Sequence, residues 1–142
     1  MLYSTILTIH IATAVGLLVL VFYTDSKAAL WLIGKTETLS HKTLTRIHKL
    51  VYAGLTIMLC TGLYMFWPVQ SYLLATPAFQ IKMAFVFFLL VNSVFISKHL
   101  HIATTHSFAS LPNKDKAMLL ISGGVSFCSW VGAVIAATQL GL

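Results

Sequence analysis

The placement of the charges constrains this chain more than any other feature of its sequence. All three acidic residues and eight of the nine Lys and Arg residues fall in two short polar stretches, residues 25–49 and 98–116. The runs around these stretches are long, apolar and almost free of charge. A soluble domain carries charge on about a quarter of its residues, whereas only 8% are charged here and 58% are hydrophobic. The sequence therefore predicts a protein whose solvent is lipid.

Four charge-poor runs have the length of membrane-spanning helices. About 20 apolar residues in helical conformation cross roughly 30 Å of hydrocarbon, and the predicted spans are about 2–24, 47–68, 78–99 and 117–140. The first run has no basic residue before its apolar stretch, so we expect a span rather than a cleaved signal. We predict a single all-α transmembrane domain over residues 1–142, an up-down-up-down four-helix bundle. The first connection is long enough for a short amphipathic helix around residues 27–33, with Trp31 at the membrane interface.

The basic residues also predict an orientation. Both polar stretches join helices on the same side, which by the positive-inside rule is cytoplasmic. Both termini then face the outer, periplasmic side of a bacterial inner membrane. The net charge of +6 is read as a topology signal and as attraction to the anionic lipid bilayer. Nucleic-acid binding is not expected, because no basic domain stands apart from the membrane, and the sequence leaves open whether the bundle forms a homo-oligomer.

Two ionisable residues fall inside predicted spans, in the outer half of the bundle. His10 lies about seven residues into the first helix, roughly 10 Å along its axis, and Lys82 enters the third helix from the same side. No Asp or Glu occurs on that side. A cation at this depth needs a partner unless its stem reaches the interface, so Lys82 either extends outward or pairs with an anion. His10 is either a ligand or a neutral imidazole bonded to a neighbouring helix, with Thr61 at a similar depth.

The other five histidines gather near the cytoplasmic side: His41, His48, His99, His101 and His106. Neutral imidazole is a favoured ligand for haem iron and for several transition metals, and two facing helices can hold a porphyrin between an opposed pair. His48 with His99 or His101 is the pair that the spacing favours, since His48 and His99 lie at nearly the same depth. The alternative is that these histidines are solvated or contact lipid phosphates.

Other chemistry finds less support in the sequence. Neither an HExxH pattern nor a cysteine ligand pair occurs, and there is no glycine-rich phosphate loop. No span holds a carboxylate of the kind expected in a proton-coupled transporter. Two further classes of function stay open beside haem binding. One is copper or other transition-metal handling by the histidines with Met58, Met65 and Met83, and the other is a non-catalytic membrane subunit or assembly partner.

Three segments resemble a known group of membrane proteins. The chain reads IHIATAVGLLVL in the first span, LTRIHKLVYAGLTIMLCTGLYMF in the second and FQIKMAFVFFLLVNSVFI in the third. Together they resemble small bacterial four-helix proteins related to the haem-associated protoporphyrinogen oxidases, the copper-resistance D family and SirB-like proteins. The resemblance covers roughly the first 100 residues and consists of a His in the first helix, a basic residue and His opening the second, a later glycine, and a Lys early in the third.

This resemblance implies a b-type haem and a redox role. It matches His10 to the membrane histidine of the group, Lys82 to its third-helix lysine, and His48 to the histidine that opens the second helix. Where the oxidase branch is expected to carry Trp and Arg after the first histidine, this chain reads VFYTDSKAALW. A haem-binding electron carrier, with a redox partner or a porphyrin-like ligand, is therefore the expected form of the function. Lys82 on one side, or Arg46 with Lys49 on the other, would neutralise the two haem propionates.

Overall fold

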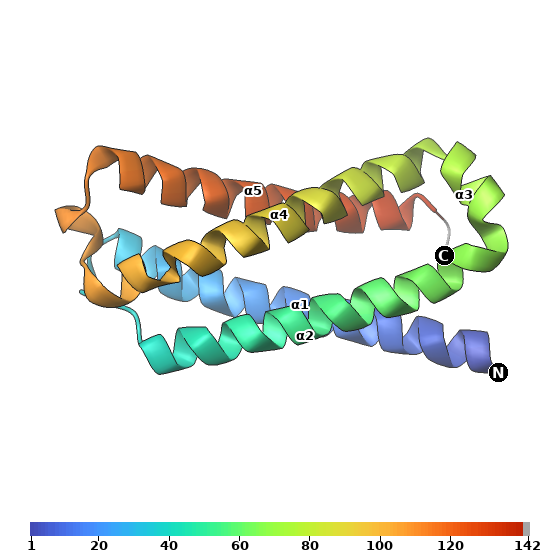
Figure 1. The fold of residues 1–142 in the computed structure, drawn as a ribbon, viewed down its shortest axis with the longest axis horizontal. Coiled ribbons are helices and arrows are strands. Elements are labelled where there is room, and N and C mark those ends of the chain that lie inside the picture. The colour runs from blue at the N-terminus through green and yellow to red at the C-terminus, as the bar shows by residue number, and fades with distance from the viewer. Residues whose placement is uncertain (141–142) are drawn as a thin grey trace.

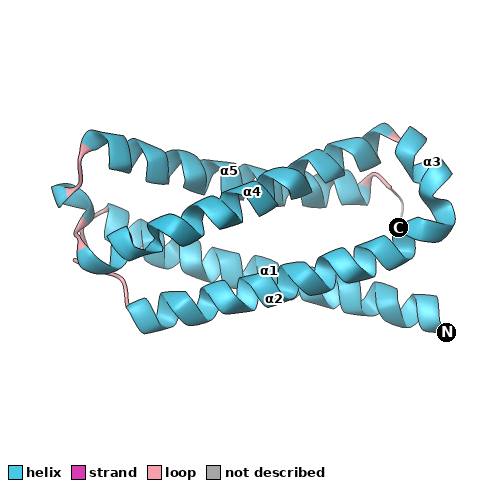
Figure 2. Ribbon diagram, in the orientation of Figure 1, coloured by secondary structure: helices cyan, strands magenta, loops and turns pink. Residues whose placement is uncertain are grey.

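Four long α-helices make up most of the molecule (Figures 1 and 2). The computed structural model describes residues 1–140, apart from the side chains of Lys98, Leu100 and His101. The long helices are α1 (Leu2–Leu32), α2 (His41–Phe66), α4 (Pro77–Thr105) and α5 (Asn113–Thr138). The 3-10 turn η1 (Trp67–Val69) and the short helix α3 (Gln70–Ala75) connect α2 to α4, and a second 3-10 turn, η2 (Phe108–Ser110), precedes α5. The described residues contain no β-strand, which confirms the all-α prediction.

The long helices pack as two antiparallel hairpins (Figure 1). In one hairpin α1 lies against α2, and in the other α4 lies against α5, while contact between the hairpins is much less extensive. The start of α1 and the end of α5 lie at the same end of the bundle, which we call the termini end. The two polar stretches meet at the opposite end, which we call the basic end. Each long helix is long and apolar enough to span a membrane.

A glycine sets the spacing of the helices in each hairpin. A Cβ atom added at Gly54 of α2 would lie 2.6 Å from Cδ2 of Leu17 in α1. A Cβ atom at Gly132 of α5 would overlap the ring of Phe85 in α4. Because lipid tails are as apolar as leucine, close packing of this kind is one of the main forces that hold membrane helices together.

Each long helix contributes one side chain to the central core. Leu17, Leu55, Leu89 and Trp130 form a buried cluster and come from α1, α2, α4 and α5 respectively. Trp130 is only 8% exposed and so packs within the bundle. Most of the other large apolar side chains are exposed, as expected where the surrounding solvent is hydrocarbon. The two hairpins are therefore joined by a small core and present the rest of their apolar surface outward.

The separate amphipathic helix expected around residues 27–33 does not form. Helix α1 instead continues unbroken to Leu32 and ends in a Schellman motif. In this motif the Lys35 N–H donates to the Leu30 carbonyl (2.9 Å), the Gly34 N–H donates to the Trp31 carbonyl (3.1 Å), and Gly34 has a φ of 74°. The helix formers of residues 27–32 propagate α1, and the first residue that favours the left-handed conformation ends it.

Trp31 is buried rather than interfacial. Its side chain is only 3% exposed and packs with Ala103 and Leu111 in a second core cluster, at the basic end. The indole Nε1–H donates to the backbone carbonyl of His106 at 3.1 Å. Because α1 is a single rigid helix, Trp31 reaches the residues at which α4 ends, which a separate interfacial helix would not allow.

Candidate functional site

His10 is held in place by a hydrogen bond across the first hairpin. Its Nδ1 atom lies 2.7 Å from Oγ1 of Thr61 in α2. Leu17 lies against Gly54. His10 is seven residues before Leu17 and Thr61 is seven residues after Gly54, so in these antiparallel helices the two pairs are separated by the same distance along the bundle. The two helices thus keep a constant register over two turns, and this register brings the histidine and the threonine to the same depth. Of the two alternatives that the sequence left for His10, the structure shows the hydrogen bond to Thr61, and the role of His10 as a ligand stays a prediction.

The hydrogen bond fixes which nitrogen of His10 carries a proton. The Thr61 hydroxyl donates to the Ile57 carbonyl at 2.7 Å. A hydroxyl has one proton to donate, so Thr61 must accept from the Nδ1–H of His10. In the neutral imidazole the lone pair is then on Nε2. A histidine that donates from one nitrogen and keeps the other free has the arrangement commonly seen in metal-ligating histidines.

Gly62 and Lys82 lie near this imidazole. A Cβ atom at Gly62 would stand 3.5 Å from Cε1 of His10, so the glycine leaves the ring edge open on that side. Lys82 is half-buried in α4, in the same termini half of the bundle. Among the described residues no acidic side chain forms an ion pair with Lys82. The termini half of the bundle therefore holds an oriented imidazole in the first hairpin and, within the described residues, a cation without an acidic partner in the second.

The histidines near the basic end are less closely connected. The Nε2 atom of His48 is buried and has no hydrogen-bond partner, and its ring meets Tyr52 edge-on with centroids 4.7 Å apart. Nδ1 of His99 donates to the Phe95 carbonyl at 2.9 Å, which leaves the lone pair of the neutral ring on Nε2. No hydrogen bond or ring contact joins His48 to His99. The side chain of His101 lies outside the described part of the structure.

The structure also shows where two other candidate binding residues, Arg46 and Met58, are located. Arg46 is exposed on α2 and forms no hydrogen bond with the described histidines. Met58 packs against the central core cluster, where a flexible thioether commonly fills space. In the described part of the chain, no group of three or more His, Cys, Asp and Glu side chains could hold a metal ion.

A polar contact between α4 and α5, in the second hairpin, was not predicted from the sequence. The Ser122 hydroxyl of α5 donates to Oδ1 of Asn92 in α4 at 2.6 Å, and Nδ2 of Asn92 donates to the Ser122 carbonyl at 3.0 Å. Ser122 is only 3% exposed. Ser93, the neighbour of Asn92, donates within its own helix to the Leu90 carbonyl at 2.8 Å. The signal that could have found this contact is Asn92 itself, a lone amide in an apolar run.

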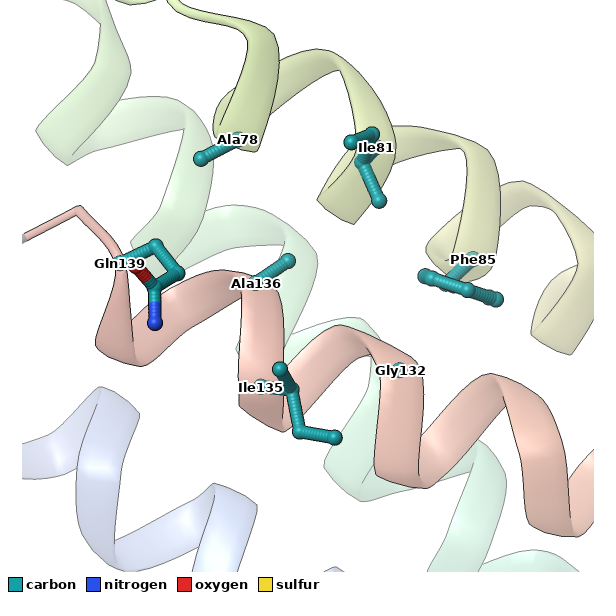
Figure 3. A pocket seen from close by; sticks show the side chains of 7 residues that line it. All are labelled: Ala78, Ile81, Phe85, Gly132, Ile135, Ala136 and Gln139. Atoms are coloured by element: carbon teal, nitrogen blue, oxygen red, sulfur yellow. The ribbon is translucent and has the colours of Figure 1, made fainter.

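An apolar groove lies between α4 and α5 at the termini end (Figure 3). It has a volume of about 320 Å³. Ile81 and Phe85 line it from α4, and Gly132, Ala136 and Gln139 from α5. A second hollow, of about 530 Å³, is lined by Tyr3 of α1 and by residues at the end of α2. Neither lining includes His10 or Lys82, so the grooves are separate from the imidazole site.

Comparison with known proteins does not extend this description. No protein-family description, curated protein or solved structure matches the chain. The function must therefore be argued from the arrangement of the side chains.

Proposed function

We propose that the protein is a multi-pass inner-membrane protein that binds b-type haem and takes part in redox chemistry, as an electron carrier or in a porphyrinogen-oxidase-like role. The observation that carries this proposal is the hydrogen bond of 2.7 Å between His10 Nδ1 and Thr61 Oγ1, because a partner on one ring nitrogen orients the imidazole and would leave Nε2 available as a ligand. The sequence resemblance to the haem-associated group supports it, because His10 and Lys82 stand at the two positions that the resemblance selects. The proposed orientation places both termini outside and the basic end in the cytoplasm, following the positive-inside rule.

The residues present fit such a group in their chemistry. His10 would supply an axial nitrogen, and Thr61 would keep the imidazole in the required tautomer. Lys82 would neutralise a propionate, which would also account for a cation placed among apolar helices without an acidic partner. The buried and unpartnered Nε2 of His48 and the free Nε2 of His99 are candidates for a second ligand level. A bound haem supplies one-electron chemistry, whose potential depends on its axial ligands, its burial and nearby charge.

The first test is the absorption spectrum of the detergent-purified protein, oxidised and then reduced with dithionite. A pyridine haemochrome assay gives the haem content per chain. We expect a b-type spectrum near unit stoichiometry. A protein that stays colourless after expression with added haem, although folded by circular dichroism, would contradict the proposal.

Single substitutions then locate the ligands. His10→Ala is expected to remove the Soret band, and His48→Ala and His99→Ala test the second level in the same assay. His41→Ala is the matched control, because His41 is an exposed histidine in the first turn of α2. Loss of haem in the control alone, or equal retention in all four variants, would refute the assignment of the ligands.

A further inference from the structure

Three basic side chains form a stripe on the first three turns of α2. Lys42, Arg46 and Lys49 follow one another at spacings of four and three residues. At 3.6 residues per turn these spacings place all three on one face of the helix. All three side chains are exposed. We call this set the basic stripe.

The basic stripe faces away from the bundle. Leu44 and Ile47, in the same three turns, are buried, and α2 has its most extensive contact with α1. The buried positions fall between the basic ones, so one side of the helix packs into the protein while the other carries the charges. The stripe is therefore open to whatever surrounds the protein.

The same face of α2 becomes apolar one turn further on. Leu50, Ala53 and Ile57 continue it at spacings of three and four residues, and all three are exposed. This apolar continuation belongs to a helix long and apolar enough to cross the membrane. The basic stripe thus stands where the lipid-facing surface of α2 leaves the hydrocarbon. It is roughly 10 Å long at 1.5 Å per residue, and lipid phosphates occupy this level of a bilayer.

Nothing within the described protein neutralises these charges. None of the three side chains has an ion pair or a side-chain hydrogen bond, and the first turn of α2 contains no acidic residue. The whole chain has only three Asp and Glu residues. The positive end of the helix dipole lies beside the stripe and adds to the repulsion. An external anion would relieve it.

We propose that the basic stripe binds the phosphodiester headgroup of an anionic phospholipid, with the acyl chains lying along Leu50, Ala53 and Ile57. The planar guanidinium of Arg46 suits two phosphate oxygens at once, and Lys42 and Lys49 act as flanking point charges. This inference depends on the membrane-spanning character of α2 and not on the binding of haem.

The test is lipid retention by the full-length protein in detergent, measured by native mass spectrometry. The protein is titrated with phosphatidylglycerol and, separately, with phosphatidylcholine. We expect one phosphatidylglycerol per chain to bind at low concentration, with much weaker binding of phosphatidylcholine. Each cation near an anionic lipid surface contributes about fivefold. The triple variant Lys42→Gln, Arg46→Gln, Lys49→Gln should therefore bind phosphatidylglycerol roughly a hundredfold more weakly.

A matched variant separates the site from the overall charge. Lys27→Gln, Lys35→Gln, Lys114→Gln removes the same number of charges from exposed positions at the same end, and it should retain most of the binding. Equal loss in the two variants would overturn the proposal, because net charge alone would then explain the binding. Retained binding in the stripe variant would also overturn it. Circular dichroism and gel filtration of each variant confirm that the fold is intact.

A competition experiment identifies the source of the phosphate. Inorganic phosphate at millimolar concentration should not displace phosphatidylglycerol, because the acyl chains contribute to the affinity. Complete displacement at that concentration would show a site for free phosphate and would overturn the assignment to lipid.

Discussion

The two hairpins are built alike, but their polar contacts differ. Among the described residues, each hairpin has a glycine at which the partner helix comes too close for a Cβ atom, Gly54 or Gly132, and a hydrogen-bonded contact between its helices. In α4 and α5 the contact joins Asn92 to Ser122, and the amide uses both of its ends within the protein. In α1 and α2 the contact joins His10 to Thr61, and one ring nitrogen is left over. The polar contact of the second hairpin is thus closed on itself, whereas that of the first leaves a ring nitrogen for the proposed ligand, with Lys82 contributed from α4.

The largest effect is expected when the polar residue of each hairpin is replaced and haem binding is compared. His10→Leu should weaken haem binding by more than the 10–100-fold typical for the loss of a residue that only supports a ligand. Asn92→Leu should leave haem binding unchanged, because the hydrogen bonds of the Asn92 amide go to Ser122 of its own hairpin. Haem titration of both proteins, followed at the Soret band, measures the difference. Equal loss in the two variants would mean that the two polar contacts do not differ in their effect on haem binding.

A second change sharpens the role of Thr61. Thr61→Val keeps the shape of the side chain but removes the acceptor for His10 Nδ1. We expect haem binding to weaken by about 10–100-fold, the usual effect of losing the partner that orients a ligand. Thr61→Ser, which keeps the hydroxyl, should restore most of the affinity in the same titration. If serine is no better than valine, the hydrogen bond does not orient the ring.

A third change compares glycines that do and do not set a helix spacing. Gly132→Ala should lower the free energy of unfolding by about 1–3 kcal/mol, because its new Cβ meets the ring of Phe85. Gly124→Ala in the same helix meets nothing within 4 Å and should be stabilising by about 0.5–1 kcal/mol. Unfolding with SDS in mixed micelles, followed by circular dichroism, gives both values. The interpretation of Gly132 fails if the two substitutions have the same sign.

The smallest expected effect measures the contact between Asn92 and Ser122. Asn92→Ala and Ser122→Ala, made singly and together, form a double-mutant cycle. Polar contacts between membrane helices usually couple by about 0.6 kcal/mol and by at most about 1.7 kcal/mol. We expect a value toward the upper end, since two hydrogen bonds link the pair. The cycle uses the same SDS unfolding. A coupling free energy near zero would mean that the contact between Asn92 and Ser122 does not stabilise the fold.

Much of the fold follows from where the charges lie. Apolar runs of about 20 residues must be helical in lipid, because each backbone polar group needs a partner. This reasoning locates the four helices but not their ends. Hydropathy marks the point at which a helix leaves the hydrocarbon, whereas α1 ends where Gly34 adopts a left-handed conformation. Because the apolar run ends before the helix does, hydropathy placed Trp31 outside the first helix and at the membrane interface.

The candidate site was predictable only within a hairpin. Adjacent antiparallel helices of known span have a fixed relation in depth, so Thr61 could be matched to His10 before the structure was known. Which residues of one hairpin face the other hairpin depends on how the helices are rotated and packed. The depth of a residue in the membrane does not specify this rotation. Equal depth therefore suggested that His48 and His99 oppose each other, yet no hydrogen bond or ring contact joins them in the described part of the structure. Their role as a ligand pair stays a prediction.

The bond between Trp31 and His106 has a consequence for biosynthesis. The two residues are 75 positions apart in the chain. At about 5–20 residues per second, the ribosome needs roughly 4–15 seconds to make the partner of Trp31 after Trp31 itself. During this interval the last turn of α1 has neither its carbonyl partner nor its apolar neighbours from α4. A nascent first hairpin therefore carries an incomplete end, which is closed only when α4 has been made.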